Sequence, residues 1–163
     1  MTPEVFISQV GELAQASMKD TGIPASFSIA EGALESGWGE SQLYKQAFNL
    51  FGVKADLGWH GEVLSMWTRE VVRGDWIKVL AKWRKYPSVK ECFDDHAKFF
   101  HANPRYHEAL GKLPDVTAFV QGIAQAGYST DPDYAEKLLS IIEDHHLTNF
   151  DKGAENGHAA GVA

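Results

Sequence analysis

The stretch PASFSIAEGALESGWG, residues 24–39, combines a helix with the turn that ends it. Pro24 suits the first turn of a helix, and Gly37 and Gly39 are typical of its end, so a helix is predicted from about Pro24 to Glu35. Glu35 then lies at the negative end of the helix dipole, where Lys or Arg is normally favoured. Local preferences tend to fail at functional sites, so Glu35 is a candidate functional residue.

The chemistry expected of Glu35 is that of a proton donor. The helix dipole, together with burial under an aromatic neighbour such as Trp38, should raise the pKa of the carboxyl group. A raised pKa keeps a carboxylic acid protonated near neutral pH, as a general acid requires. The spacing alone also allows an exposed glutamate at a helix end.

Around this stretch the pattern is helical, with a single β-hairpin. Val, Ile, Trp and Thr in residues 64–72 and 76–84, separated by Arg73-Gly74-Asp75, predict the hairpin, and Gly-rich residues 49–63 predict a loop. Helical periodicity or capping residues predict further helices at residues 3–20, 41–47, 88–101, a short segment from 103, 115–126 and 130–145. The expected fold class is α+β, predominantly helical.

The composition sets the size and the class of the protein. The chain has 163 residues, enough for one domain, expected at residues 1–150 with a disordered tail at 151–163. A net charge of −7 argues against nucleic acid as a partner. The single cysteine, Cys92, excludes an internal disulfide and is expected to be a buried, inert thiol.

Targeting and cofactor signals are not found in the sequence. Residues 1–15 lack the apolar run of a signal peptide, and no segment approaches the roughly 20 apolar residues of a membrane span. We therefore expect synthesis in the cytoplasm, with any action on the cell wall following release or export by another system. His96, His101 and His107 do not share a helix face at metal-binding spacing, so neither a metal nor another cofactor is expected. We also expect a monomer.

Six ordered segments resemble glycoside hydrolase family 73, bacterial β-N-acetylglucosaminidases that include many autolysins. The resemblance covers roughly residues 5 to 147. It is carried by ALESGWG (33–39), NLFGVK (49–54), TRE (68–70), KWRKY (82–86), NPRY (103–106) and GYSTDPDYA (127–135). It implies a lysozyme-like fold with a small β-hairpin lobe flanking the cleft. It further implies an endo-β-N-acetylglucosaminidase that cleaves the β-1,4 bond after N-acetylglucosamine in peptidoglycan, with Glu35 as the general acid.

The resemblance also implies a second carboxylate, Glu70, on the hairpin. In an inverting enzyme it would activate water, and in a retaining enzyme it would attack the sugar. If the substrate's own acetamido group acts instead, Glu70 need not be a base. The alternative is a structural cross-strand pair: a three-residue hairpin loop would place Lys78 opposite Glu70, whereas a two-residue loop would place an apolar residue there.

The remaining site candidates follow from the same resemblance. Tyr128 matches a tyrosine near the acid that positions the acetamido group or a water. Asn49, Phe51 and Trp38 are candidates for substrate binding. For each of these a structural alternative remains: Tyr128 with its hydroxyl in solvent, Asn49 as a turn residue bonded to its own backbone, Phe51 in the core, and Trp38 as a wall beside Glu35.

One residue departs from the family pattern. Glu31 stands one helical turn before Glu35, where family members often carry Gln. Residues at i and i+4 share a helix face. If both carboxyls face the cleft, their repulsion should raise the pKa of one of them, whereas a Glu31 pointing to solvent would be inert.

Two competing functions stay open on the sequence. A muramidase or a lytic transglycosylase of the same fold would cut after N-acetylmuramic acid, although the Asn-Leu-Phe-Gly run favours the glucosaminidase. A non-catalytic cell-wall-binding or assembly module is the other, and the presence of both Glu35 and Glu70 argues against it. The lack of a leader suits a phage endolysin, a secretion-system effector or a domain excised from a longer protein.

Overall fold

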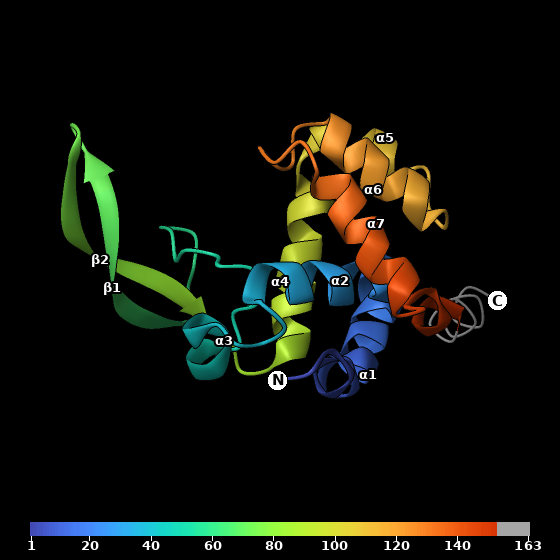
Figure 1. Ribbon diagram of the computed structural model, residues 1–163, viewed down its shortest axis with the longest axis horizontal. Coiled ribbons are helices and arrows are strands. Elements are labelled where there is room, and N and C mark those ends of the chain that lie inside the picture. The colour runs from blue at the N-terminus through green and yellow to red at the C-terminus, as the bar shows by residue number, and fades with distance from the viewer. Residues whose placement is uncertain (153–163) are drawn as a thin grey trace.

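The computed structural model describes residues 1–152. Residues 153–163 of the predicted tail lie outside this range. The described chain forms a helical body with one protruding β-hairpin (Figure 1). In chain order the elements are α1 (Pro3–Thr21), α2 (Ala25–Ser36), α3 (Gln42–Ala47), β1 (Glu62–Val72), β2 (Asp75–Lys85), α4 (Val89–Ala102), the 3₁₀ helix η1 (Pro104–Tyr106), α5 (His107–Leu110), α6 (Val116–Gln125) and α7 (Tyr134–Asp144). This arrangement confirms the α+β, mainly helical class.

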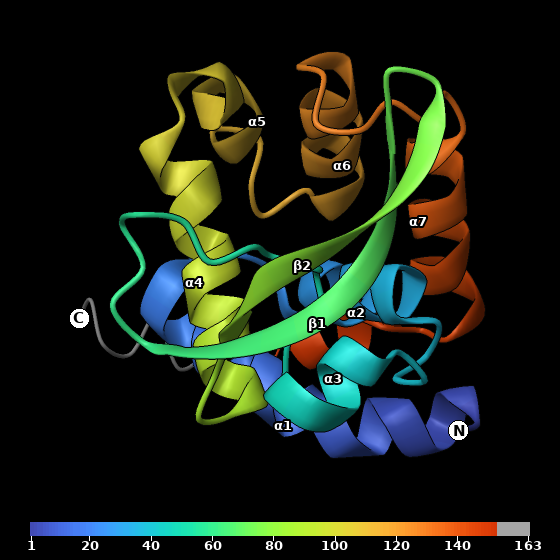
Figure 2. The ribbon, with the colours of Figure 1, turned by 90° about the vertical axis from the view of Figure 1, so that its left-hand side faces the viewer.

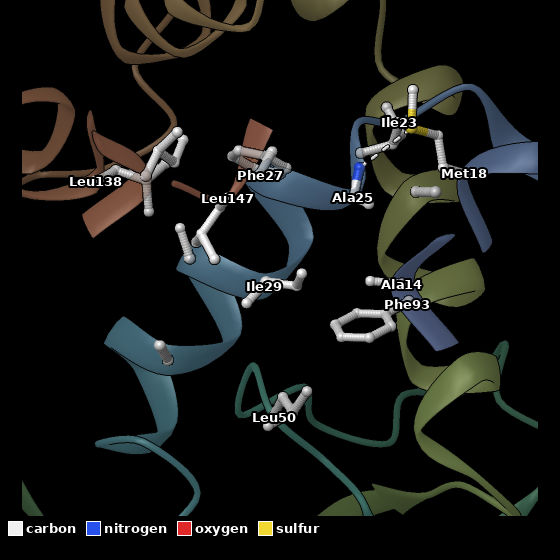
Figure 3. Close-up of a cluster of buried hydrophobic side chains, with 14 of the residues drawn as sticks. Ala14, Met18, Ile23, Ala25, Phe27, Ile29, Leu50, Phe93, Leu138 and Leu147 are labelled. Carbon is white, nitrogen blue, oxygen red and sulfur yellow. Dashed lines mark hydrogen bonds between the residues drawn. The ribbon is translucent and has the colours of Figure 1, made fainter. Parts of the chain in front are cut away.

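Helix α2 is the central element of the body. Every residue of α2 except Leu34 and Glu35 is buried, and the helix packs against α1, α6 and α7. A helix whose sequence is apolar or small on all sides is stable only in such a position. Figure 3 shows Phe27 and Ile29 of α2 within a cluster that includes Phe93 and Leu138 from other helices. The helix that carries the candidate acid is therefore rigidly held.

The hairpin has a two-residue turn. Val72 pairs with Asp75, and Arg73 and Gly74 between them have φ values of 52° and 85°. Positive φ at both central residues is the geometry that matches the natural twist of paired strands. In this register Glu70 lies opposite Ile77, while Lys78 lies opposite Arg69. The cross-strand neighbour of Glu70 is therefore the apolar residue Ile77 and not a lysine.

The hairpin has two different faces, and it crosses in front of α2 when viewed from the side (Figure 2). The face that carries Glu70 is turned toward the loop around Lys54, which forms a bridge to Trp83. The opposite face is open: Trp67 and Trp76 are 69% and 72% exposed. This open face also carries the exposed cations Arg69, Lys78 and Lys82 and no carboxylate.

The folded domain extends slightly further than the sequence predicted. Residues 148–152 are helical, and Asp151 is buried. Its carboxylate accepts hydrogen bonds from the Ser26 backbone N–H at 2.8 Å and from the Ser26 hydroxyl at 2.6 Å. A carboxylate at a helix N-terminus satisfies orphan N–H groups and the helix dipole, so Asp151 belongs to the domain and not to the tail.

The other element predictions agree with the structure to within a few residues. The segment after Asn103 is split into η1 and α5. Cys92 is buried as expected, and burial raises the pKa of its thiol to about 12. None of the helices within residues 1–152 has the length and apolar character of a bilayer span. The same residues contain no cluster of three or more potential metal ligands.

Candidate active site

A cleft of about 550 Å³ lies at the C-terminal end of α2. It is lined by α2, α4, the start of α7 and the segments around Val53 and Tyr128, with Arg84 contributed by β2. Of the residues chosen from the sequence, Glu31, Glu35, Phe51 and Tyr128 line this cleft. The structure therefore brings the predicted acid and the predicted tyrosine together.

Glu35 occupies the last turn of α2, directly before the left-handed Gly37 cap. Its side chain is accessible from the cleft, but the cleft walls partly desolvate it, and this desolvation raises the pKa of the carboxyl group. Among the described residues, none donates a hydrogen bond to Glu35. A proton on this carboxyl group would therefore be free to be directed at a substrate, as a general acid requires.

Glu31, one turn earlier on α2, is 1% exposed and is held by two tyrosines. The Tyr128 hydroxyl donates to Oε1 at 2.8 Å, and the Tyr134 hydroxyl donates to Oε2 at 2.7 Å. Desolvation is the largest cause that raises the pKa of Glu31, to about 7, and repulsion from Glu35 adds to it, while the two tyrosine hydrogen bonds lower it. Of the two alternatives for Glu31, the structure thus shows the one that faces the cleft.

His96 of α4 continues this network behind Tyr128. Its Nε2 lies 2.8 Å from the Tyr128 hydroxyl, and its ring stacks on Phe51 with the ring centroids 3.9 Å apart. Burial lowers the pKa of His96 to about 3, so the imidazole is neutral. Phe51 is therefore both a wall of the cleft and the packing partner that orients His96.

Glu70 lies on the hairpin, outside the set of residues that line the cleft. Its carboxylate is 3.5 Å from the ammonium group of Lys54, and the Lys54 and Glu70 side chains are 60% and 41% exposed. An ion pair with this much exposure contributes little to stability. The catalytic role of Glu70 stays a prediction, and it would require the hairpin to approach the helical body when substrate is bound.

Trp38 and Asn49 also lie outside the cleft lining. The Trp38 ring contacts Phe6 and His145 edge to face, with centroids 5.8 and 5.0 Å away. Asn49 is buried; its amide nitrogen donates to the carbonyl groups of Val53 and Arg84, each at 2.9 Å, and its oxygen accepts from the Val53 N–H. These hydrogen bonds attach the loop to β2, so the contacts of Asn49 are structural. Substrate binding by either residue stays a prediction.

Two residues of the site were missed by sequence reasoning. Tyr134 was assigned only to the apolar face of the last helix, and His96 was considered only as a metal ligand. Each is buried with its polar atom directed into the network. The only available signal was that a buried tyrosine or histidine needs a polar partner, and the sequence does not show where that partner lies.

Comparison with known proteins identifies the family. Residues 11–147 match the model of the Glucosaminidase family, described as mannosyl-glycoprotein endo-beta-N-acetylglucosaminidase. The chain is 36% identical over 143 residues to the peptidoglycan hydrolase FlgJ of Vibrio parahaemolyticus, a match that covers 86% of this chain and 46% of FlgJ. It is 35% identical over 153 residues to the exo-glucosaminidase LytG of Bacillus subtilis, covering 91% and 54% of the two chains.

A solved structure agrees with these matches. The C-terminally truncated glycoside hydrolase domain of Salmonella typhimurium FlgJ superposes with a TM-score of 0.77 at 34% identity, covering 88% of this chain and 97% of that domain. The chain thus spans about half the length of the curated relatives but nearly all of the hydrolase domain. With its family model, its fold and its carboxylate-bearing cleft in agreement, the chain belongs to the Glucosaminidase family of glycoside hydrolases.

Proposed function

We propose that this domain hydrolyses the β-1,4 bond after N-acetylglucosamine in bacterial peptidoglycan, with Glu35 as the general acid. The observation that carries the proposal is a partly desolvated carboxyl group with a raised pKa, accessible from a cleft of about 550 Å³. Such a group can protonate the leaving glycosidic oxygen. Relatives named as peptidoglycan hydrolase and exo-glucosaminidase support the choice of substrate.

The proposal is tested by the chemistry of the product ends. Purified peptidoglycan is digested, reduced with borohydride, hydrolysed and examined by mass spectrometry. We expect reduced N-acetylglucosamine at the new ends. Reduced muramic acid would instead indicate a muramidase, 1,6-anhydro ends would indicate a lytic transglycosylase, and sedimentation with the wall without cleavage would indicate a binding module. Each of these three results would overturn the proposal.

We further propose that Glu70 supplies the second carboxylate when the hairpin closes over the substrate. Replacing Glu70 with Gln should then lower kcat by roughly 10²-fold, the usual range for loss of a general base. The measurement is the initial rate of release of reducing ends at saturating peptidoglycan.

Two matched variants separate this role from the ion pair. Lys54→Gln removes the partner of Glu70 but leaves the carboxylate, and Glu62→Gln removes an exposed carboxylate elsewhere on β1. Both should keep kcat within a few-fold of the parent. If Lys54→Gln lost as much activity as Glu70→Gln, the pair would be structural and Glu70 would not be the base.

A further inference from the structure

The open face of the hairpin carries aromatic rings and cations in alternating rows. Residues paired across two strands share a face, and the successive pairs on the open face include Trp67 with Leu80, Arg69 with Lys78, and Val71 with Trp76. All six side chains are exposed, and none of them lines the cleft. The two indole rings are four residues apart along the strands, about 13 Å, with the two cations between them.

Arg69 and Lys78 form a like-charge pair directly across the two strands. Like charges in opposite positions, with Cβ atoms about 5 Å apart, destabilise a sheet. The carboxylates of the hairpin all occupy positions of the other face, namely Glu62, Glu70 and Asp75. No carboxylate within residues 1–152 lies at ion-pair distance from either cation. Such a local conflict is typical of a functional position, and an anion bound between the two cations would relieve it.

The character of this face limits the kind of ligand that fits it. Cations gathered on one exposed face of a chain with a net charge of −7 attract an anion to that face. Exposed indole rings offer a broad apolar surface on which the C–H faces of sugar rings can stack. A ligand that satisfies both features carries sugars and negative charges along its length. Peptidoglycan has this chemistry, because its glycan strands bear peptide stems with free carboxylates.

We propose that the open face is a second peptidoglycan-binding surface, separate from the cleft. On it, Trp67 and Trp76 stack on sugar rings, and Arg69 and Lys78 together hold a carboxylate of a peptide stem. The choice of polymer rests on the proposed function. Because the cleft is part of the same domain, a strand held by the open face raises the effective concentration of neighbouring glycan at the cleft.

The test measures binding in the Glu35→Gln background, so that the polymer is not cleaved. Purified sacculi free of teichoic acid are titrated, and the protein left unbound after sedimentation gives the Kd. Arg69→Gln/Lys78→Gln should raise the Kd roughly ten-fold, the effect of losing two exposed charge contacts. This double variant should melt no lower than its background, because it removes a like-charge pair. The matched control, Lys19→Gln/Lys112→Gln, removes two exposed cations elsewhere and should change the Kd by less than about two-fold.

The rings and the stems are tested separately in the same assay. Trp67→Ala and Trp76→Ala should each raise the Kd roughly five-fold, and Trp67→Tyr, which keeps an aromatic ring, should recover most of the lost affinity. Sacculi from which an amidase has removed the peptide stems should bind the Glu35→Gln protein about as weakly as intact sacculi bind the double variant, because the carboxylates are gone.

Three results would overturn this inference. The first is a Kd for Arg69→Gln/Lys78→Gln equal to that of its lysine control. The second is equal binding of intact and stem-free sacculi. The third is binding to phosphatidylglycerol vesicles that is lost in the double variant while binding to sacculi is unchanged, which would assign the face to a lipid surface. A parent that binds sacculi through the open face but releases no sugar ends would refute the proposed function and support this inference.

Discussion

Glu35→Gln is expected to lower kcat on purified peptidoglycan by roughly 10³-fold at pH 5, which is within the range for loss of a general acid. The amide cannot deliver a proton to the leaving oxygen, yet it has nearly the shape of the protonated acid. Because no described residue donates a hydrogen bond to the Glu35 side chain, the substitution breaks no bond of the fold. The melting temperature and the fraction of protein that sediments with peptidoglycan should therefore stay close to those of the parent.

The appropriate control for this variant is Glu136→Gln. Glu136 is an exposed carboxylate in the first turn of α7, so it matches the change in charge without reaching the cleft. It should retain full activity. If Glu35→Gln cleaved at the parental rate, proton donation would have to come from another residue and the assignment of the acid would be wrong.

Phe27→Ala should lower the free energy of unfolding by about 4 kcal/mol, as is typical for removing a buried aromatic ring. Phe27 is fully buried on α2 and meets Phe119 and Phe100 edge to face, with ring centroids 5.1 and 5.5 Å away. It also lies parallel to His96, with an interplanar angle of 6°. The cavity would therefore open in the core and beneath the Tyr128–Glu31 network at the same time.

Urea unfolding followed by circular dichroism measures this loss. Leu57→Ala is the matched control, because Leu57 is fully exposed and its truncation should change stability by less than about 0.5 kcal/mol. If Phe27→Ala lowered the free energy of unfolding by less than about 1 kcal/mol, the core around α2 would have to collapse into the space left by the ring. The ring would then not be a main contact of the core, contrary to what its burial suggests.

The elements themselves could be predicted from the sequence because their signals are local. Pro24 and Gly37 mark the ends of α2, and Gly74 marks the hairpin turn, since the backbone conformations needed there favour those residue types. Glu35 could be selected for a similar reason, because it conflicts with the preference of its own helix end. These predictions depend on residues close together in the chain.

The network around Glu31 could not be predicted in the same way. Tyr128 and Tyr134 reach Glu31 across 97 and 103 residues of sequence, and His96 reaches Tyr128 across 32. The helical pattern places Tyr134 on a buried face but does not indicate which polar atom its hydroxyl meets. Likewise, the pattern left Asp151 in a tail, although a partner 125 residues away holds it in the domain.

The hairpin is positively charged, whereas the rest of the chain is negatively charged. The hairpin carries six of the chain's 15 Lys and Arg residues, namely Arg69, Arg73, Lys78, Lys82, Arg84 and Lys85, but only Glu62, Glu70 and Asp75 of its 22 acidic residues. Because the hairpin forms one end of the long axis (Figure 1), the protein has an electric dipole along that axis in addition to its net charge of −7. Near an anionic polymer, the electric field of the polymer exerts a torque on this dipole and turns the hairpin toward the polymer. A protein repelled as a whole would thus approach the wall with its hairpin first.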